Sequence, residues 1–391
     1  MKRTLIMTVL LVCLQAVFTM NEGFAQKESI DAVRVYVGTY TRKESKGIYT
    51  FTLNPKTGET SEPELAAELV NPSFVAISPS GKFLYAVNEV SDFAGPGQGA
   101  AGGVTGFQLD AQSGKLTKIN SQSSGGPGAC HLTVDQTGKC VLVANYGGGS
   151  VASLPVNTDG SLKPAASLMQ HIGSSINKRR QKGPHAHSVN VDAANKFAVV
   201  ADLGLDQLLV YKLNAEDGTL TPNDPAFTKS IPGGGPRHLS FHPNGKHAFA
   251  NNEMLLSVTA YNYDANKGVL TPIETYSTVP EGTGVEGNST AETLVHPSGK
   301  FLYVSNRGPN SIAMFRIRKD GTLKPLGYAP TNGEIPRGFG IDPTGNFLLA
   351  ANQNSDTVVV FRIDQKTGKL SATGTVLNIS TPVNVRMLAI D

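Results

Sequence analysis

The chain has 391 residues, among them 42 Gly, 23 Pro and no Trp, with a formal net charge of +3. Gly and Pro are spread evenly along the chain, which is typical of many short strands joined by turns. The small net charge, with no basic stripe and no alternation of basic and aromatic residues, argues against nucleic acid as a partner.

The N-terminus has the pattern of a signal peptide. Lys2 and Arg3 precede an apolar run over residues 5–18, and small residues permit cleavage after Ala25. A membrane anchor would need about 20 unbroken apolar residues, and no later segment is long and apolar enough to span a membrane. We therefore predict a signal peptide over residues 1–25 and export, to the periplasm, of a protein with no membrane span after cleavage.

Two cysteines, Cys130 and Cys140, remain after cleavage. They flank a strand-turn-strand unit, and Cys130 lies far back along the first strand. At ~3.3 Å per residue the two are more than ~10 Å apart, which exceeds the ~7 Å limit for a disulfide. We expect two free thiols.

A motif of strand, tight turn and strand ending on Asn or Asp recurs six times, about fifty residues apart. The copies occupy residues 71–89, 129–146, 186–203, 236–253, 290–307 and 336–353. Two further strand patterns follow in each repeat, and no segment keeps a helical period for three turns. This pattern predicts an all-β propeller in which each repeat is one four-stranded blade.

The chain outside these repeats supplies a seventh blade. Residues 34–40 resemble a second strand and residues 47–53 a third, while residues 382–390 can provide the missing first strand. Such a blade, shared by the N- and C-terminal strands, closes the ring and removes its open edges. The prediction is a single seven-bladed domain over residues 26–391, and we expect a monomer.

Alignment of the copies on their turns gives three columns of residues that belong together in space. Six positions before the turn stand Ser73, Cys130, His187, Arg237, Ala291 and Arg337. The next column holds Phe74, His131, Ser188, His238, Glu292 and Gly338. After the recurrent Asn or Asp come Glu89, Tyr146, Leu203, Glu253, Arg307 and Gln353, with Tyr40 in the split blade.

First strands begin, and second strands end, at the same face of the ring because the two are antiparallel. We therefore expect Arg237, Glu253, His187 and Arg307 to meet at one mouth of the channel. Two arginines, a histidine and a glutamate in a concave site are suited to binding an anion.

Other polar residues have structural interpretations. The recurrent Asn and Asp are expected to bond backbone, and His242, His247 and His296 belong to turns on the opposite face. The basic run over residues 178–182 is interpreted as a solvated loop, with recruitment of an acidic substrate as the alternative.

The segments GTYTRKESKGIYTF, RQKGPHAHS, GGGPRHLSFHPNGKHAFANNE and YVSNRG resemble the seven-bladed propeller lactonases. That family includes propeller-type 6-phosphogluconolactonase and the fungal carboxymuconate lactonizing enzyme, and the resemblance covers the chain from about Val33 onward. It implies that His187, Arg237, Glu253 and Arg307 bind and turn over a lactone, with His185 competing for the role of His187. An exported chain departs from the family, because the phosphorylated sugar lactone is a cytosolic metabolite.

For such a lactonase, Glu253 or His187 would take the proton of the attacking water, and Arg237 and Arg307 would hold the oxyanion and the acidic group of a small anionic lactone. Residues expected to contact the substrate are His185, Arg337, His131, His238, Glu292 and Tyr40. We expect no cofactor and no metal. The alternatives are carboxymuconate-type lactonization and a non-catalytic propeller that binds a ligand or protein at the same mouth.

Overall fold

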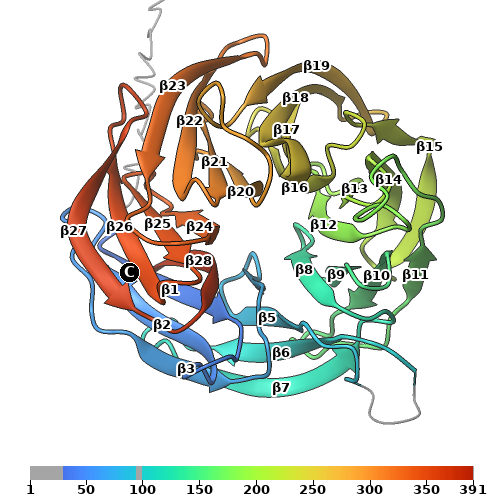
Figure 1. The fold of residues 1–391 in the computed structure, drawn as a ribbon. Coiled ribbons are helices and arrows are strands. Elements are labelled where there is room, and N and C mark those ends of the chain that lie inside the picture. Colours follow the sequence, from blue (N-terminus) through green and yellow to red (C-terminus); the bar gives the residue numbers. More distant parts are fainter. Residues whose placement is uncertain (1–29, 94–98, 391) are drawn as a thin grey trace, which may run out of the picture.

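The computed structural model describes residues 30–93 and 99–390. The signal peptide predicted for residues 1–25 lies outside them. Seven four-stranded antiparallel sheets stand as blades around a central axis (Figure 1). Within the described residues the one helical element is the 3-10 turn η1, Glu253–Leu255. The predicted all-β, seven-bladed architecture is confirmed.

The strands follow one another from the axis outward in each blade, with β28 innermost in the first. Blade 1 contains β28 (Pro382–Ile390), β1 (Ala32–Thr39), β2 (Gly47–Leu53) and β3 (Glu64–Glu68). Blade 2 contains β4 (Val75–Ile77), β5 (Phe83–Asn88), β6 (Gly103–Leu109) and β7 (Leu116–Ser123). Blade 3 contains β8 (Ala129–Val134), β9 (Cys140–Asn145), β10 (Ser150–Pro155) and β11 (Ser167–Gln170).

The remaining blades repeat the same order. Blade 4 contains β12 (Ala186–Val191), β13 (Phe197–Asp202), β14 (Gln207–Asn214) and β15 (Thr219–Lys229). Blade 5 contains β16 (Pro236–Phe241), β17 (His247–Asn252), β18 (Ser257–Asp264) and β19 (Val269–Ser277). Blade 6 contains β20 (Ser289–Val295), β21 (Phe301–Arg307), β22 (Ser311–Ile317) and β23 (Leu323–Pro330). Blade 7 contains β24 (Pro336–Ile341), β25 (Phe347–Asn352), β26 (Thr357–Ile363) and β27 (Leu370–Asn378).

The core lies between the blades rather than inside any one of them. Among the described residues, seven clusters of buried apolar side chains occur, one at each interface between neighbouring blades. Second strands such as β9, β13 and β17 are buried along their whole length, because neighbouring blades cover both of their faces. β9 and β13 are accordingly apolar up to their final Asn or Asp, whereas β17 also buries His247 and Asn251. The outer strand β27 is largely exposed.

Glycines in the outer turns permit close contact between blades. Gly268, in the turn between β18 and β19, has φ of +66°, and a Cβ there would lie 2.6 Å from the ring of Phe197 in the preceding blade. Any other residue at this position would be strained and would also clash. The same contact recurs around the ring, which explains why glycine is distributed so evenly along the chain.

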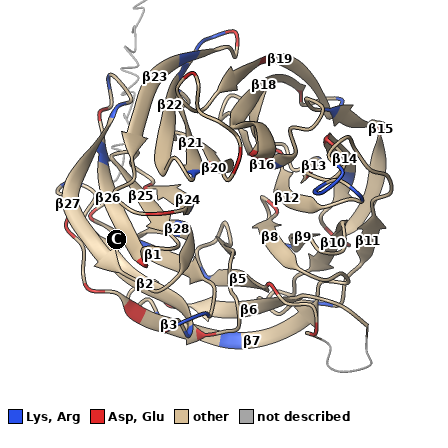
Figure 2. Ribbon diagram, viewed as in Figure 1, with Lys and Arg blue, Asp and Glu red and all other residues tan. Residues whose placement is uncertain are grey.

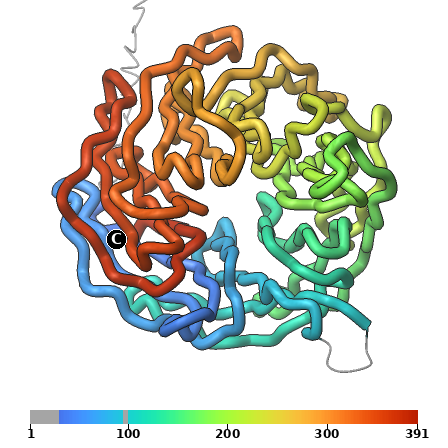
Figure 3. The backbone as a smooth tube through the Cα atoms, viewed as in Figure 1, coloured from blue at the N-terminus to red at the C-terminus, as the bar shows by residue number. Residues whose placement is uncertain are grey.

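Strands from the two ends of the chain close the ring. β1 pairs antiparallel with β28, in a register that runs from Ala32 opposite Ile390 to Thr39 opposite Pro382. In Figure 3 the blue N-terminal segment runs beside the red C-terminal strand. The predicted shared blade is therefore confirmed.

Charges of both signs are distributed around the ring in Figure 2, without a stripe of one sign. Cys130 and Cys140 are both buried and free, as expected. None of the helices in the described part of the chain has the length and apolarity needed to cross a bilayer.

Candidate active site

A cavity of about 270 Å³ opens at the mouth of the central channel where first strands begin and second strands end. Its wall contains residues from blades 2 to 7 and from the segment between blades 3 and 4. They are Glu89, Cys130, Tyr146, Arg180, His187, Glu253, Ser289, Arg307 and Arg337. The volume lies just below the ~300–1,000 Å³ typical of pockets for drug-sized ligands, so it suits a smaller molecule.

A glycine-rich loop places Glu253 at this mouth. Glu253 follows β17 and begins η1, and its backbone N–H donates to Gly235 O at 2.8 Å. The N–H groups of Gly233 and Gly235 donate to the Asp206 carboxylate of blade 4, each at 2.7 Å. Both glycines have positive φ, which lets the loop fold tightly onto that carboxylate. Asp206 therefore fixes the path of the chain that presents Glu253.

The Glu253 carboxylate is the centre of a cluster of cations and is only 4% exposed. Oε1 lies 2.8 Å from Arg180 Nη2, while Oε2 lies 3.1 Å from Arg237 Nε and 3.2 Å from Arg307 Nη2. The Nε2 atom of His187 is 3.9 Å from Oε2. Burial by itself would raise the pKa of Glu253, but Arg307 and Arg237 outweigh it and hold that pKa well below its usual range. The four predicted neighbours do meet.

Two of these arginines are fixed on both sides. Arg237 Nη1 donates to Ala291 O at 2.7 Å, and Arg307 Nη2 donates to Thr290 O at 2.9 Å. Both contacts run to β20 of blade 6. Burial lowers the pKa of Arg237, and it lowers that of Arg307 to about 10. Both guanidiniums remain charged at neutral pH.

Arg180 is a site residue that the sequence did not single out. Its loop is shaped by Asn177, whose Oδ1 accepts the backbone N–H groups of Arg179 at 3.0 Å and Arg180 at 3.1 Å. Arg180 Nη2 also donates to the Tyr146 hydroxyl at 3.0 Å. Lys178, Arg179 and Arg180 are all exposed, as the interpretation of residues 178–182 as a solvated loop anticipates. The guanidinium of Arg180 nevertheless reaches Glu253 and forms part of the cavity wall.

Arg337 differs from the other cavity arginines. Among the described residues its guanidinium has no hydrogen-bond or ion-pair partner, and it lies over the Tyr40 ring at 5.4 Å from the centroid. Burial disfavours its charge, but the Tyr40 and Glu89 side chains more than compensate, so that the pKa of Arg337 is raised. A permanently charged group therefore faces the cavity with its donors free.

His187 lines the cavity as a neutral imidazole. Burial and then Arg237 hold the pKa of His187 well below its usual value. Its Nδ1 lies 3.7 Å from the Sγ of Cys130, and burial raises the pKa of that thiol. The thiol is therefore protonated at neutral pH.

Three of the predicted substrate-contact residues form a deeper layer of the channel. His238 Nδ1 is 2.7 Å from Glu292 Oε1, and the His131 ring lies 5.2 Å from the ring of His238. Arg237 Nη1 is 2.9 Å from His238 Nε2, which links this layer to the cluster above. None of the three is part of the cavity wall.

Two other predicted contact residues stand behind the wall. His185 stacks on Tyr146 with ring centroids 4.6 Å apart, and its Nδ1 bonds the Tyr146 carbonyl at 2.9 Å. The Tyr40 hydroxyl donates to Glu89 Oε1 at 3.1 Å and to Oε2 at 3.0 Å. The geometry thus places His187 rather than His185 in the cavity.

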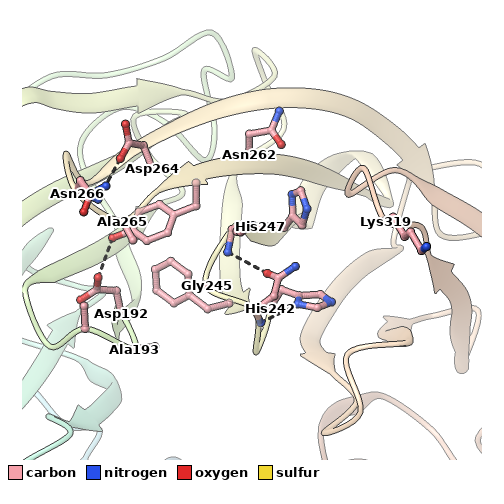
Figure 4. Close-up of a pocket in the computed structure, with 15 residues that line it drawn as sticks. Asp192, Ala193, His242, Gly245, His247, Asn262, Asp264, Ala265, Asn266 and Lys319 are labelled. Atoms are coloured by element: carbon pink, nitrogen blue, oxygen red, sulfur yellow. Dashed lines mark hydrogen bonds between the residues drawn. The ribbon is translucent and has the colours of Figure 1, made fainter.

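A larger cavity of about 900 Å³ lies on the opposite face, among the turns of blades 4 and 5 (Figure 4). His242 lies at its edge, and its Nε2 donates to Gly299 O of the next blade at 2.8 Å. His296 makes the equivalent bond to Gly345 O at 2.9 Å. These histidines join neighbouring blades, as their interpretation as turn residues anticipates.

In the part of the chain that the structure describes, no group of three or more His, Cys, Asp or Glu is arranged to hold a metal ion. Four of the recurrent Asn residues bond backbone as expected: Asn145 Nδ2, for example, donates to Ser124 O at 2.9 Å. Asn252 instead donates to the hydroxyls of Ser257 and Thr259. The metal-free and cofactor-free reaction anticipated from the sequence stays a prediction.

Comparison with known proteins identifies relatives along almost the whole chain. The 6-phosphogluconolactonase of Bacillus subtilis (strain 168) is 38% identical over 355 residues, which cover 90% of this chain and 97% of the relative. The 6-phosphogluconolactonase of Formosa agariphila is 37% identical over 90% of this chain and 99% of its own length.

Solved structures agree with these relatives. The periplasmic gluconolactonase of Pseudomonas aeruginosa superposes with a TM-score of 0.85 at 32% identity, covering 92% of this chain and all of that one. A family model described as "Lactonase, 7-bladed beta-propeller" matches residues 34–387. The chain therefore belongs to the seven-bladed β-propeller lactonase family.

Proposed function

We propose that this protein is a lactonase that hydrolyses a sugar lactone carrying an acidic group, of the 6-phosphogluconolactone type, in the cavity at the channel mouth. The observation that carries the proposal is the guanidinium of Arg337, which has no hydrogen-bond or ion-pair partner among the described residues and lies beside three arginines that already share the Glu253 carboxylate. Glu253 forms ion pairs with Arg180, Arg237 and Arg307. The N–H donors of Arg337, in contrast, remain available to a ligand.

The charge of the cavity supports an acidic substrate. Its wall carries three arginines and two glutamates, and Arg237 lies directly behind Glu253. With His187 neutral, the site has an excess of positive charge. A planar guanidinium binds a carboxylate or phosphate through two parallel hydrogen bonds, and a buried site strengthens them. Arg337 is accordingly the proposed anchor for the acidic group.

Lactone hydrolysis adds water to a carbonyl carbon and opens the ring, so negative charge develops on the carbonyl oxygen. Arg307 and Arg180 line the cavity and are held in place by Glu253, which makes them the proposed donors to that oxyanion. Fixed donors need no reorganisation during the reaction and are worth more in a site that excludes water. Glu253 then serves to orient the arginines.

Neither residue proposed from the sequence as the base is strongly basic here. Its arginine partners hold Glu253 in the ionised form and so weaken it as a proton acceptor. Burial and Arg237 oppose the protonation of His187. His187 is therefore proposed to bond the substrate or the water as a neutral imidazole, close enough to Glu253 to be oriented by it.

We further propose that the protein is exported and needs no metal. Export is supported by the signal-peptide pattern before Ala25 and by a structural relative described as periplasmic. The cationic mouth disfavours a divalent ion. Cell fractionation tests the first proposal, and unchanged turnover after prolonged chelation with EDTA tests the second.

The lactonase proposal is tested by measuring acid release in a pH-stat from 6-phosphoglucono-δ-lactone, glucono-δ-lactone and a muconate lactone, above the uncatalysed rate. We expect the phosphorylated lactone to give the highest kcat/KM. Arg337→Ala should raise KM for that substrate about 10- to 100-fold, the value of lost charge-assisted bonds. The same change should affect the uncharged glucono-δ-lactone only slightly. Wild-type protein that opens none of these lactones would contradict the proposal, and it would favour a non-catalytic propeller.

A further inference from the structure

Glu89 is a second carboxylate in the cavity wall, and the repeat pattern assigns it no function. It directly follows β5 in blade 2, three blades away from the Glu253 of blade 5, so the two lie on opposite walls of the channel mouth (Figure 1). They occupy the same position of the repeat, immediately after the recurrent Asn. The fold thus presents two carboxylates to the same space.

The partners of the two carboxylates are different in kind. Glu253 is surrounded by guanidiniums, whereas Glu89 accepts hydrogen bonds from neutral hydroxyls. Tyr40 donates to both Glu89 oxygens, at 3.1 and 3.0 Å, and Ser73 Oγ donates to Oε2. Among the described residues no Lys, Arg or His lies within ion-pair distance of Glu89.

The two hydroxyl donors are themselves held in place. Tyr40 is 7% exposed and Ser73 is 5% exposed. Burial raises the pKa of Tyr40 to about 12, so its hydroxyl keeps its proton at any working pH and acts as a donor. Both hydroxyls donate to the carboxylate oxygens of Glu89, which act as acceptors. The carboxylate is therefore oriented without being neutralised.

Glu89 also stands beside the proposed anion anchor. Arg337 lies over the ring of the same Tyr40 that binds Glu89, and Glu89 is one of the groups that favour the charge of Arg337. Other titratable groups around Glu89 are Cys130, whose thiol is protonated, Tyr146, and the histidines His187 and His238, whose pKa values burial holds well below the usual value. Arg237 lines the channel below them. A lactone whose acidic group is bound by Arg337 therefore lies next to the Glu89 carboxylate. The arginines that are paired with Glu253 lie across the cavity from it.

We propose that Glu89 is the general base of the reaction and that Tyr40 and Ser73 are its positioning residues. This assignment rests on the proposed lactonase function. Glu89 removes a proton from water while the water oxygen bonds to the lactone carbonyl carbon, and the carbonyl π pair moves to its oxygen. When the tetrahedral intermediate collapses, the ring C–O bond breaks and the alkoxide takes the proton back from Glu89. Lactone and water give one hydroxy acid, and the carboxylate is restored.

Glu89→Gln is the first test, because the amide keeps the shape but cannot accept a proton. We expect kcat to fall by about 10²- to 10⁴-fold, the usual contribution of a general base, with KM changed only a few-fold. The acid limb of the kcat/KM profile should disappear from the residual activity. Glu68→Gln, an exposed glutamate on β3 of blade 1, is the matched control and should keep wild-type kinetics.

Tyr40→Phe is the second test, and it can be carried out even if the Glu89→Gln variant does not fold. Loss of a donor to the ionised carboxylate raises the pKa of that carboxylate, so the acid limb should move to higher pH while activity at high pH is largely kept. A merely structural role of Tyr40 would lower activity without moving the limb.

The outcomes separate the two proposals. An active wild type together with Glu89→Gln at the wild-type rate would overturn the role of Glu89 and leave the lactonase proposal intact. So would an unmoved acid limb in Tyr40→Phe. A wild type that opens no lactone overturns the proposed function, and the role of Glu89 with it. Low kcat with retained binding of 6-phosphogluconate in Glu89→Gln supports both.

Discussion

The two cavities at opposite faces of the ring differ both in size and in the charged groups that line them. The far-face cavity is more than three times larger than the one at the mouth, at about 900 against 270 Å³. Several of its polar groups are paired within the fold: His242 bonds Gly299, and the Tyr263 hydroxyl donates to Asp192 at 3.1 Å. Among the described residues, the buried Nδ1 of His247 has no hydrogen-bond partner. At the mouth, Arg337 is half-buried and charged, and among the described residues its guanidinium has no hydrogen-bond or ion-pair partner. A charged group with free donors, rather than volume, distinguishes the mouth.

Of the substitutions at the two faces, Glu253→Gln at the mouth should have the largest effect on turnover and on the free energy of unfolding. Three guanidiniums would lose their shared counter-charge in a buried cluster, so both the arrangement of the oxyanion donors and the stability of the mouth should suffer. We expect turnover to fall by at least about 10³-fold and unfolding free energy to fall by about 3–5 kcal/mol, as when one partner of a buried ion pair is removed. Urea unfolding and pH-stat rates on the same samples measure both. Wild-type turnover would remove the basis for treating this cluster as the active site.

Arg237→Ala should have the next largest effect. Arg237 connects Glu253 to the deeper layer through His238, so its loss disturbs the cluster but leaves Arg180 and Arg307 in place. We expect turnover to fall by about 10²- to 10³-fold, as much as the loss of one oxyanion donor would cost, because Glu253 loses a partner that holds it in the position from which it orients Arg180 and Arg307. Arg237→Lys should restore little of the lost turnover, because an ammonium group cannot bond two partners at once as the planar guanidinium does. Full activity of the lysine variant would show that charge alone is needed.

Acid should weaken the fold more through the channel than through the far face, where burial also lowers the pKa of His242 and His296 but to a smaller extent. Burial lowers the pKa of His131, His187 and His238 well below the usual value, so below about pH 6.5 the unfolded chain binds protons that the folded chain does not. Each histidine then costs up to about 1.4 kcal/mol per pH unit as the pH falls. Glu292 acts in the opposite direction, because burial raises its pKa and the folded state takes up its proton first.

The measurement for this pH effect is the urea midpoint between pH 7.5 and 5.5. The midpoint should decrease across this interval, and His131→Asn, which removes one titrating group, should make the decrease shallower. A midpoint that is constant or rises toward pH 5.5 would show that these histidines titrate normally.

The smallest effect is expected on the far face. His242→Ala removes one bond between blades 5 and 6, worth about 1 kcal/mol, and leaves the mouth untouched. Thermal unfolding should begin a few degrees lower, with kcat and KM unchanged for every lactone that the wild type accepts. A large loss of turnover in His242→Ala would indicate that the far-face cavity, rather than the mouth cavity, is the active site.

The repeats made the fold and much of the site predictable. Because the turns align the copies, residues such as Arg237 and Arg307 could be placed side by side although they are distant in sequence. Arg180 could not be predicted as a site residue because it lies in the connection between β11 and β12, outside the repeat. The loop directs Arg180 inward through the hydrogen bonds of the Asn177 side chain, which the sequence does not reveal. His131, His238 and Glu292 were assigned to the mouth because a column fixes the face of a residue but not its depth along the channel.

Glu89 shows a second limit of the sequence. Its column was recognised, but nothing in the sequence indicates that it faces Tyr40 and Ser73 instead of a cation. Which carboxylate is paired with guanidiniums depends on the side chains of neighbouring blades. That information exists only once the ring has closed.

The pairing of β1 with β28 has a consequence for how the protein is made. Every residue in the wall of the mouth cavity, from Glu89 to Arg337, is synthesised before β28, yet these walls face one another only in a closed ring. Until residues 382–390 are available, β1 has an unpaired edge that can associate with other chains. Joining strands so far apart in sequence is also slow, since the entropy of closing the loop must be overcome before any contact rewards it. β28 thus lines no part of the mouth cavity, but its pairing with β1 determines when the cavity of a newly made chain is complete.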